Sequence, residues 1–414
     1  MPKILAVVLS RRMLVSLLMG FSCGLPLLLT MGLLQAWMQQ EGVDLATIGL
    51  ITLVQIPYTL KFVWAPVLDR FTLPFLGRRR GWLLIIQFAL IAAVCWLAFS
   101  NPGQSPLLAS LAAVAVAFAS ASQDIVVDAY RREDLADEEL GLGSSLYVNG
   151  YRLGMLLASG GGMIMADFLS FTVVYLIMAA SLLVGVVTTL FTPEPPTVAG
   201  APATLREAVV EPFVEFFSRS GVRWGLLVLA FILLYKIGDS MASAMTTPFY
   251  LELGFTKAQI GTVVKLFGFW ATIAGALAGG VLILKMGISL SLWVFGFLQA
   301  VSTAGFAVLA QMGPSLPWLA AVIGFENLSA GLGSAAFMAF MAALTNKRFT
   351  ATQYALLSSL IGVPRSLASA PTGYLAQALG WQEFFIFCTL MAIPGMLMLA
   401  KFAPFWKEKA AQKA

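Results

Sequence analysis

Hydrophobic residues gather into long stretches separated by short polar segments along this chain. A helix needs about 20 apolar residues to cross a bilayer. Twelve stretches meet this length and predict membrane-spanning helices at about 13–37, 46–68, 81–99, 106–129, 142–165, 171–191, 224–250, 257–281, 287–310, 317–344, 352–376 and 381–402. The sequence therefore predicts an all-α polytopic membrane protein with twelve transmembrane helices.

The longest polar stretch, 193–223, falls between the sixth and seventh predicted spans. It predicts a cytoplasmic linker that includes an amphipathic segment on the cytoplasmic face of the membrane. We therefore expect a six-helix half at 1–192, the linker at 193–223, and a six-helix half with a short basic tail at 224–414.

Basic residues set the expected orientation, because cytoplasmic loops are enriched in Lys and Arg. With the N-terminus inside, nineteen of the 25 Lys and Arg residues fall in cytoplasmic segments, and the outside loops hold only Lys257. Both termini are expected to be cytoplasmic. The first apolar span runs on without a clear cleavage pattern, so we expect no cleaved signal peptide.

Composition narrows the function. With 59% hydrophobic residues, 11% charged residues and a mean hydropathy of +0.88, a soluble enzyme and a nucleic-acid binder are excluded. The chain has no His, so imidazole chemistry is excluded, and proton handling must fall to carboxylates. The three isolated Cys residues lie in apolar stretches. We therefore expect no disulfide, metal or cofactor, and a monomer in the lipid bilayer.

Two pairs of markers indicate an internal duplication. Gly49 and Gly261 follow the first outside loop of each half and are 212 residues apart. Arg152 and Arg365 lie within the fifth and eleventh spans and are 213 residues apart. A similar offset for both pairs predicts that the two halves repeat one six-helix unit.

Nine charged residues fall inside predicted spans, where ionisable groups are costly and usually pair or function. They are Lys61, Asp124, Asp128, Arg152, Lys236, Asp239, Lys265, Glu326 and Arg365. So many charges predict a polar cavity between the halves. The residues expected to contact substrate there are Gln35, Lys61, Gln123, Asn149, Tyr151, Arg152, Lys236, Lys265, Asn327 and Arg365.

The best candidate for a proton-binding group is Asp124, which follows a run of small residues in the fourth span. Burial disfavours the charged form of a carboxylate, and a nearby cation such as Arg152 favours it. Asp128 lies one turn further on and is a second candidate, although it could simply pair with Arg131 or Arg132. The alternative for Asp124 is a structural ion pair between neighbouring helices.

The second half offers two more proton-coupling candidates, Asp239 and Glu326. Lys236 and Asp239 are three residues apart, so they share a helix face and could neutralise each other. For this pair a structural role competes with a functional one. Lys265 could bind an anionic group or extend to the membrane surface.

The segment WAPVLDRFTLPFLGRRRGW joins the second and third spans. It predicts a gating latch in which an acid at one helix end meets the arginines, or the N-terminal end of another helix. The residues are Asp69, Arg70, Arg78, Arg79 and Arg80. Anchoring of the loop by positive charge alone is the competing interpretation.

Several blocks together resemble the AmpG-type muropeptide permeases of Gram-negative bacteria, within the major facilitator superfamily. They include GFSCGLPLLLTMGLLQAWM, LKFVWAPVLDR, LGRRRGW, SASQDIVVDA, GYRLGML, LYKIGD, FENLSAGLG and TATQYALLSS, and they cover nearly the whole chain. Some members carry further hydrophobic segments after the twelfth span, which this chain lacks.

This resemblance implies the major facilitator fold and an importer in the bacterial inner membrane. The implied substrate is N-acetylglucosaminyl-1,6-anhydro-N-acetylmuramic acid, with or without a short peptide, carried with protons. Import would feed cell-wall recycling and, in some bacteria, β-lactamase induction. An exporter of drugs or another metabolite is the alternative that the fold alone leaves open. A membrane enzyme is disfavoured, because the chain has no His, no GxSxG motif and no P-loop.

Overall fold

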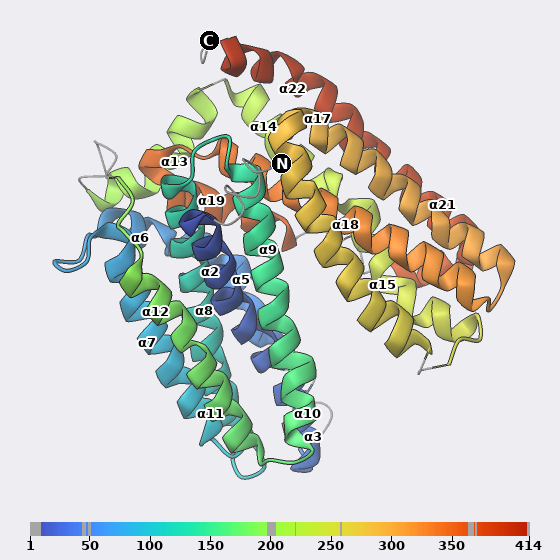
Figure 1. The fold of residues 1–414 in the computed structure, drawn as a ribbon, viewed down its shortest axis with the longest axis horizontal. Helices are drawn as coiled ribbons and strands as arrows, with labels where there is room; N and C mark the ends of the chain where they lie inside the picture. Colours follow the sequence, from blue (N-terminus) through green and yellow to red (C-terminus); the bar gives the residue numbers. More distant parts are fainter. Residues whose placement is uncertain are drawn as a thin grey trace. The chain divides into compact units, whose positions relative to one another are not determined.

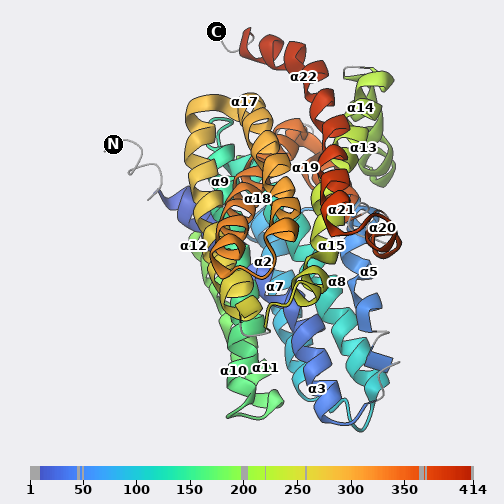
Figure 2. The same cartoon turned by 90° about the vertical axis from the view of Figure 1, so that its right-hand side faces the viewer.

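The computed structural model describes residues 10–43, 47–48, 51–196, 204–219, 221–256, 259–362, 368 and 371–411. Within these ranges every regular element is helical (Figures 1 and 2). Eight helical stretches are long and apolar enough to cross a membrane: Arg11–Gln40, Arg78–Ala98, Pro106–Asp134, Phe171–Phe191, Val222–Glu252, Ile260–Met312, Leu316–Leu344 and Trp381–Phe402.

The chain separates into two compact units. The first contains Met1–Phe213 together with Thr345–Ser359, and the second contains Val214–Leu344 and Leu360–Ala414. Residues 345–359 come from the second half of the sequence but pack within the first unit, so we name them the docking segment. The boundaries expected at 192/193 and 223/224 stay predictions.

The first unit contains α2 to α12, the first part of α13, and α19 of the docking segment. Its main helices are α2 (Arg11–Leu28), α3 (Leu34–Gln40), α5 (Ile56–Leu60), α6 (Ala65–Arg70), α7 (Arg78–Ala98), α8 (Pro106–Asp134), α9 (Leu140–Leu156), α10 (Gly162–Ala166), α11 (Phe171–Ser181), α12 (Leu183–Phe191) and α19 (Thr350–Leu360). The long helix α7 packs against α8, α11 and α12 (Figure 1). Helix α13 (Leu205–Ser218) occupies the predicted linker and crosses the boundary between the units.

The second unit is built from α14 (Val222–Tyr235), α15 (Ile237–Glu252), α17 (Gly268–Met312), α18 (Leu316–Leu344), α20 (Thr372–Leu379), α21 (Trp381–Leu390) and α22 (Ile393–Ala411). Helix α17 contains parts of two predicted spans and breaks at Gly287, where φ is 74°. Positive φ is strained for residues with a side chain, and glycine adopts it readily.

Short irregular turns interrupt several predicted spans. The second predicted span comprises a 3₁₀ turn (Ile51–Gln55), α5, another 3₁₀ turn (Lys61–Val63) and α6. Short π-helical segments follow α2 and α9 and precede α17, at Leu29–Leu33, Leu157–Gly161 and Ile260–Phe267. The second predicted span is not among the eight long apolar stretches, and Ile260–Met312 covers parts of two predicted spans, so the count of twelve spans stays a prediction.

Glycines set the close approach of one helix pair in each unit. A Cβ added to Gly24 of α2 would overlap the carbonyl oxygen of Tyr151 in α9, and one added to Gly150 would overlap the carbonyl oxygen of Leu17. In the second unit, a Cβ on Gly275 of α17 would overlap the carbonyl oxygen of Leu328 in α18. Small residues allow such backbone contact between membrane helices.

Candidate functional site

Asp69 lies at the C-terminal end of α6 and its side chain is fully buried. Its Oδ1 accepts hydrogen bonds from Arg78 Nη2 at 3.1 Å and from Arg79 Nη2 at 2.8 Å. Arg79 is also fully buried and forms a second ion pair, at 2.6 Å, with Glu133 of α8. A buried charge is tolerated only when it is paired and hydrogen-bonded, which both carboxylates provide for Arg79.

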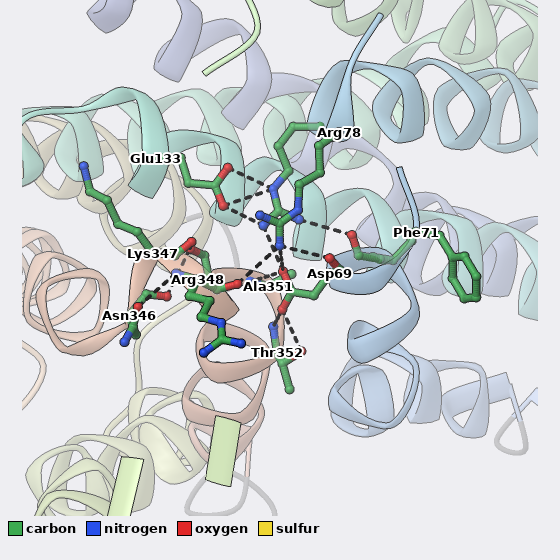
Figure 3. A network of polar contacts seen from close by, with 12 residues as sticks. Asp69, Phe71, Arg78, Glu133, Asn346, Lys347, Arg348, Ala351 and Thr352 are labelled. Atoms are coloured by element: carbon green, nitrogen blue, oxygen red, sulfur yellow. Dashed lines mark hydrogen bonds and ion pairs between the residues drawn. The ribbon is translucent and has the colours of Figure 1, made fainter. Parts of the chain in front are cut away.

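The same carboxylate binds the start of α19 in the docking segment (Figure 3). Asp69 Oδ2 accepts hydrogen bonds from the backbone N–H and the hydroxyl of Thr352, both at 2.7 Å, and Oδ1 accepts one from the N–H of Ala351 at 3.3 Å. The N-terminus of a helix has unpaired N–H groups and a partial positive charge, so it stabilises an anion. Asp69 thus contacts both the arginines and the N-terminal end of another helix, which the sequence predicted as alternative partners.

Arg80 and Arg70 lie outside the contacts of Asp69. Arg80 donates to the backbone oxygens of Thr189 and Leu190, at 3.0 and 2.8 Å, and so satisfies carbonyls at the C-terminal end of α12. The guanidinium of Arg70 lies 5.4 Å from the ring centre of Phe71. Of the five predicted latch residues, the structure brings together Asp69, Arg78 and Arg79.

Glu194 completes the start of α7. Its two carboxylate oxygens accept hydrogen bonds from the backbone N–H groups of Arg79 and Arg80, at 2.7 and 3.0 Å. Glu194 follows α12 and binds the N-terminus of α7, while Arg80 of α7 binds the C-terminus of α12. The two side chains therefore hold the neighbouring ends of both helices.

A second buried polar cluster surrounds Asp124 on α8. Asp124 is 6% exposed, and its Oδ1 has no hydrogen-bond partner among the residues that the structure describes. The charged groups that act on it most strongly are Lys61 and Asp128. Lys61 is itself only 7% exposed, so this cation and both acids lie inside the protein.

Asp128 lies one turn beyond Asp124 and forms an ion pair with Arg131 at 3.0 Å. This pairing is one that the sequence suggested. Arg131 Nη2 also donates to the hydroxyl of Tyr354 in the docking segment at 2.9 Å, and Nη1 donates to Ser144 at 3.0 Å. The guanidinium lies 4.5 Å from the ring centre of Tyr147, which adds a cation–π contact.

Of the five remaining predicted substrate contacts in the first unit, Gln123 and Asn149 are buried. Gln123 donates to Ser22 at 3.2 Å, and Asn149 donates to the carbonyl oxygen of Ser145 at 3.0 Å. The side-chain oxygens of both amides have no hydrogen-bond partner among the described residues. The half-buried members are Gln35, Tyr151 and Arg152.

A third cluster lies in the second unit. Lys236 Nζ lies 3.6 Å from Asp239 and donates to Gln299 at 3.0 Å, so Lys236 and Asp239 do pair as their spacing suggested. Asp239 and Gln299 line a small cavity with Tyr235 and Thr303. Asp239 also interacts with Glu326 of α18.

The two contacts of Ser302 favour a protonated Glu326. Ser302 Oγ lies 2.9 Å from the carbonyl oxygen of Gln299 and 2.5 Å from Glu326 Oε2. The hydroxyl has one hydrogen, and a carbonyl oxygen can only accept. If the hydroxyl donates to the carbonyl, Glu326 must supply the hydrogen for its own contact with Ser302, so a protonated Glu326 satisfies both contacts.

Three other predicted residues lie apart from this cluster or outside the described structure. Asn327 accepts from Thr272 at 2.8 Å and donates to the carbonyl oxygen of Ile323 at 3.0 Å, so it joins α17 to α18. Lys265 is exposed. Arg365 lies outside the described residues.

Sequence reasoning missed Glu133, Glu194, Thr352 and Tyr354. Glu133 and Glu194 sit at the ends of predicted spans, where acids are common and carry no special signal. The TATQY block contains both Thr352 and Tyr354. The polar residues of this block, at the start of a predicted apolar span, were the signal that could have identified both residues.

The comparisons with known proteins agree with this architecture. The Major Facilitator Superfamily matches residues 13–369. The chain is 44% identical over 385 residues to the protein named anhydromuropeptide permease from Escherichia coli (strain K12), covering 92% of this chain and 78% of that one.

Two solved transporters share the fold. The proton:xylose symporter XylE is 10% identical with a TM-score of 0.73, covering 95% of each chain. The human organic anion transporter MFSD10 is 18% identical with a TM-score of 0.68, covering 96% of this chain and 100% of that one. By its matched residues and its identity to the Escherichia coli protein, the chain belongs to the Major Facilitator Superfamily and, within it, to the family of the anhydromuropeptide permeases.

Proposed function

We propose that this protein imports anhydromuropeptides, the sugar–peptide fragments released from the bacterial cell wall, across the inner membrane. The observation that carries the proposal is the 44% identity to the Escherichia coli anhydromuropeptide permease over 92% of the chain. Identity at this level along nearly the whole chain supports a shared substrate class. Import of these fragments would return cell-wall material to the cytoplasm.

Transport is driven by the proton gradient, and Asp124 is the leading candidate to carry the proton. Its buried carboxylate has an oxygen without a hydrogen-bond partner among the described residues, and it acts on a nearby buried cation, Lys61. Adding a proton to such a group changes the balance of charge inside the protein. Asp128, Asp239 and Glu326 remain further candidates.

The substrate carries carboxylates on its peptide and hydroxyl and amide groups on its sugars. The cations Lys61 and Arg152 suit the carboxylates, and the amides of Gln123 and Asn149 suit the sugar groups. The unpartnered oxygens of both amides support this role, because buried polar groups normally find a partner.

The transport cycle is alternating access, in which one face of the protein closes as the other opens. The docking segment is the cytoplasmic gate. Asp69 and Arg131 hold it to the first unit, and its release opens the protein to the cytoplasm. Both termini lie on this cytoplasmic side.

The test is uptake of radiolabelled anhydromuropeptide into right-side-out membrane vesicles, with and without an imposed pH gradient. Uptake should require the gradient. Asp124→Asn should abolish gradient-driven uptake at normal protein levels, while Asp167→Asn, which alters an exposed acid, should not.

Gradient-independent uptake by the wild-type protein would overturn proton coupling. Normal uptake by Asp124→Asn would move the proton to another carboxylate. A deletion strain that keeps muropeptide uptake but becomes sensitive to drugs would identify an exporter instead.

A further inference from the structure

Buried charged residues lie between Asp124 and the docking segment. Lys61 acts on both Asp124 and Asp128. Asp128 pairs with Arg131 at 3.0 Å, and Arg131 binds the hydroxyl of Tyr354 at 2.9 Å. All of these residues belong to the first unit.

One nitrogen of Arg131 makes the last two contacts. Nη2 donates both to Asp128 Oδ1 and to the hydroxyl of Tyr354. The position of this nitrogen therefore depends on how strongly Asp128 attracts it. A change at Asp128 alters the geometry of the contact with the docking segment.

The cluster contains two acids and two cations, so it is neutral when both acids are ionised. The other titratable groups that face it come from each surrounding helix: Cys23 of α2, Tyr58 of α5, Tyr147 and Tyr151 of α9, and Tyr354 of α19. None of these thiol and phenol groups brings a third cation. A proton added to Asp124 therefore leaves Lys61 and Arg131 sharing the one remaining carboxylate, Asp128.

We propose that Arg131 is the positioning residue that couples protonation of Asp124 to release of the docking segment. Protonation removes the attraction between Lys61 and Asp124, and Lys61 then attracts Asp128 in competition with Arg131. Arg131 shifts, its hydrogen bond to Tyr354 weakens, and the segment leaves the first unit. The inference rests on the proposed proton-driven import, because it assigns Asp124 as the group that takes the proton.

This coupling gives the order of events that import requires. An empty carrier with ionised Asp124 keeps its docking segment bound. A carrier that has taken a proton from outside loses one of the contacts that hold this segment, and it opens inward. The contacts of Asp69 with the segment do not depend on this cluster.

The experiment measures docking of the segment directly by pulsed electron paramagnetic resonance. Nitroxide labels at Ala136, which is exposed, and Lys347, which is half-buried, report the distance between the α8–α9 turn and the docking segment. The half-buried Cys95 is replaced by Ser, since Cys23 and Cys388 are buried. The full-length protein is studied in nanodiscs over a pH series without substrate.

In the wild type the ratio of released to docked protein should rise as pH falls, by about tenfold or more, since a hydrogen bond to a charged group is lost. Asp124→Asn should show, at every pH, the ratio of released to docked protein that the wild type reaches at low pH. Tyr354→Phe keeps the ring but removes the hydroxyl, so it should raise the released ratio at high pH and flatten the pH response.

Arg131→Gln should flatten the response as well, and the double variant Asp128→Asn with Arg131→Gln removes both charges if the single variant folds poorly. Arg132→Gln is the matched control, because Arg132 is equally buried and binds Asp137 at 3.0 Å. It should keep the wild-type pH response.

Two outcomes would overturn the inference in distinguishable ways. If the wild-type protein docks its segment equally at every pH, proton coupling through Asp124 is wrong and the inference fails with it. If Tyr354→Phe and Arg131→Gln show the same pH response as the wild type, proton coupling survives. Arg131 would then only stabilise α8. If Arg132→Gln lost its pH response to the same extent, the effect of Arg131→Gln would be general destabilisation, and the inference would also fail.

Discussion

Asp69→Asn is the substitution that tests the gate most directly. It replaces one carboxylate oxygen by an NH₂ group and removes the charge, while the volume of the side chain stays nearly the same. The docking segment donates three hydrogen bonds to this carboxylate, two from Thr352 and one from Ala351. All three lose their charged acceptor.

The structure allows a magnitude for this loss. A hydrogen bond to a charged group contributes about 1.5–3 kcal/mol and a neutral one about 0.5–1.5 kcal/mol. Each of the three bonds is therefore weakened by about 1 kcal/mol, and together they lose about 3 kcal/mol. At 1.4 kcal/mol per decade, the equilibrium between docked and released segment shifts by roughly 100-fold. The new NH₂ group also faces N–H and O–H donors, which adds to the loss.

The distance between labels at Ala136 and Lys347 gives the two populations, and vesicle uptake gives the consequence. Released protein should accumulate, and uptake should fall while substrate affinity is kept, because Asp69 lies outside the polar cluster around Asp124. Thr352→Val is the graded control. It removes the hydroxyl but keeps the backbone N–H bond, so its shift should be smaller.

A population in Asp69→Asn equal to that of the wild type would refute the reasoning. Asp69, Arg78 and Arg79 would then stabilise the fold and its orientation without gating. A loss of substrate binding in this variant would also contradict it, because the effect would then extend beyond the docking segment.

Three further predictions concern stability, measured by thermal unfolding in detergent. Glu194→Gln should cost about 1 kcal/mol, because the N-terminus of α7 loses a charged cap. Gly24→Ala should cost about 1–3 kcal/mol by forcing α2 from α9, whereas Gly32→Ala should be nearly neutral, since a Cβ there meets nothing within 4 Å. Glu326→Gln should be tolerated better than Glu326→Ala, because the amide can still donate to Ser302; equal losses would contradict a protonated Glu326.

The apolar stretches in the sequence predicted most of the helices, because a bilayer imposes length and hydrophobicity on each span. The predicted span at 106–129 corresponds to α8, and the one at 317–344 corresponds to α18. Prediction was weaker where backbone geometry departs from a regular helix, as in the 3₁₀ turns on either side of α5. Apolar composition does not distinguish these turns from a continuous helix.

The candidate site was predicted in part. Charge at bilayer depth singled out Asp124, Lys61 and Asp128, and the structure groups them. The sequence predicted the two kinds of group that bind Asp69, namely arginines and the N-terminal end of a helix. It did not identify Thr352, which lies 283 residues further along the chain. A local pattern shows that a carboxylate needs a partner, and only the fold shows which distant group supplies it.

Residues 345–359 pack within the first unit, so the two compact units do not coincide with the two halves of the sequence. Several contacts hold the docking segment, among them those of Gln353 with Pro212 and of Arg348 with Glu211. The contacts made by Asp69 and by Arg131 differ in their chemistry. Asp69 binds backbone N–H groups at a helix start, which no proton at Asp124 removes. Arg131 binds Tyr354 from within a cluster whose charge a single proton alters. A gate with constant contacts and one responsive contact stays closed by default and opens when the responsive contact weakens. Because the cost of opening is divided among several contacts, no single contact needs to be strong enough to lock the transporter permanently.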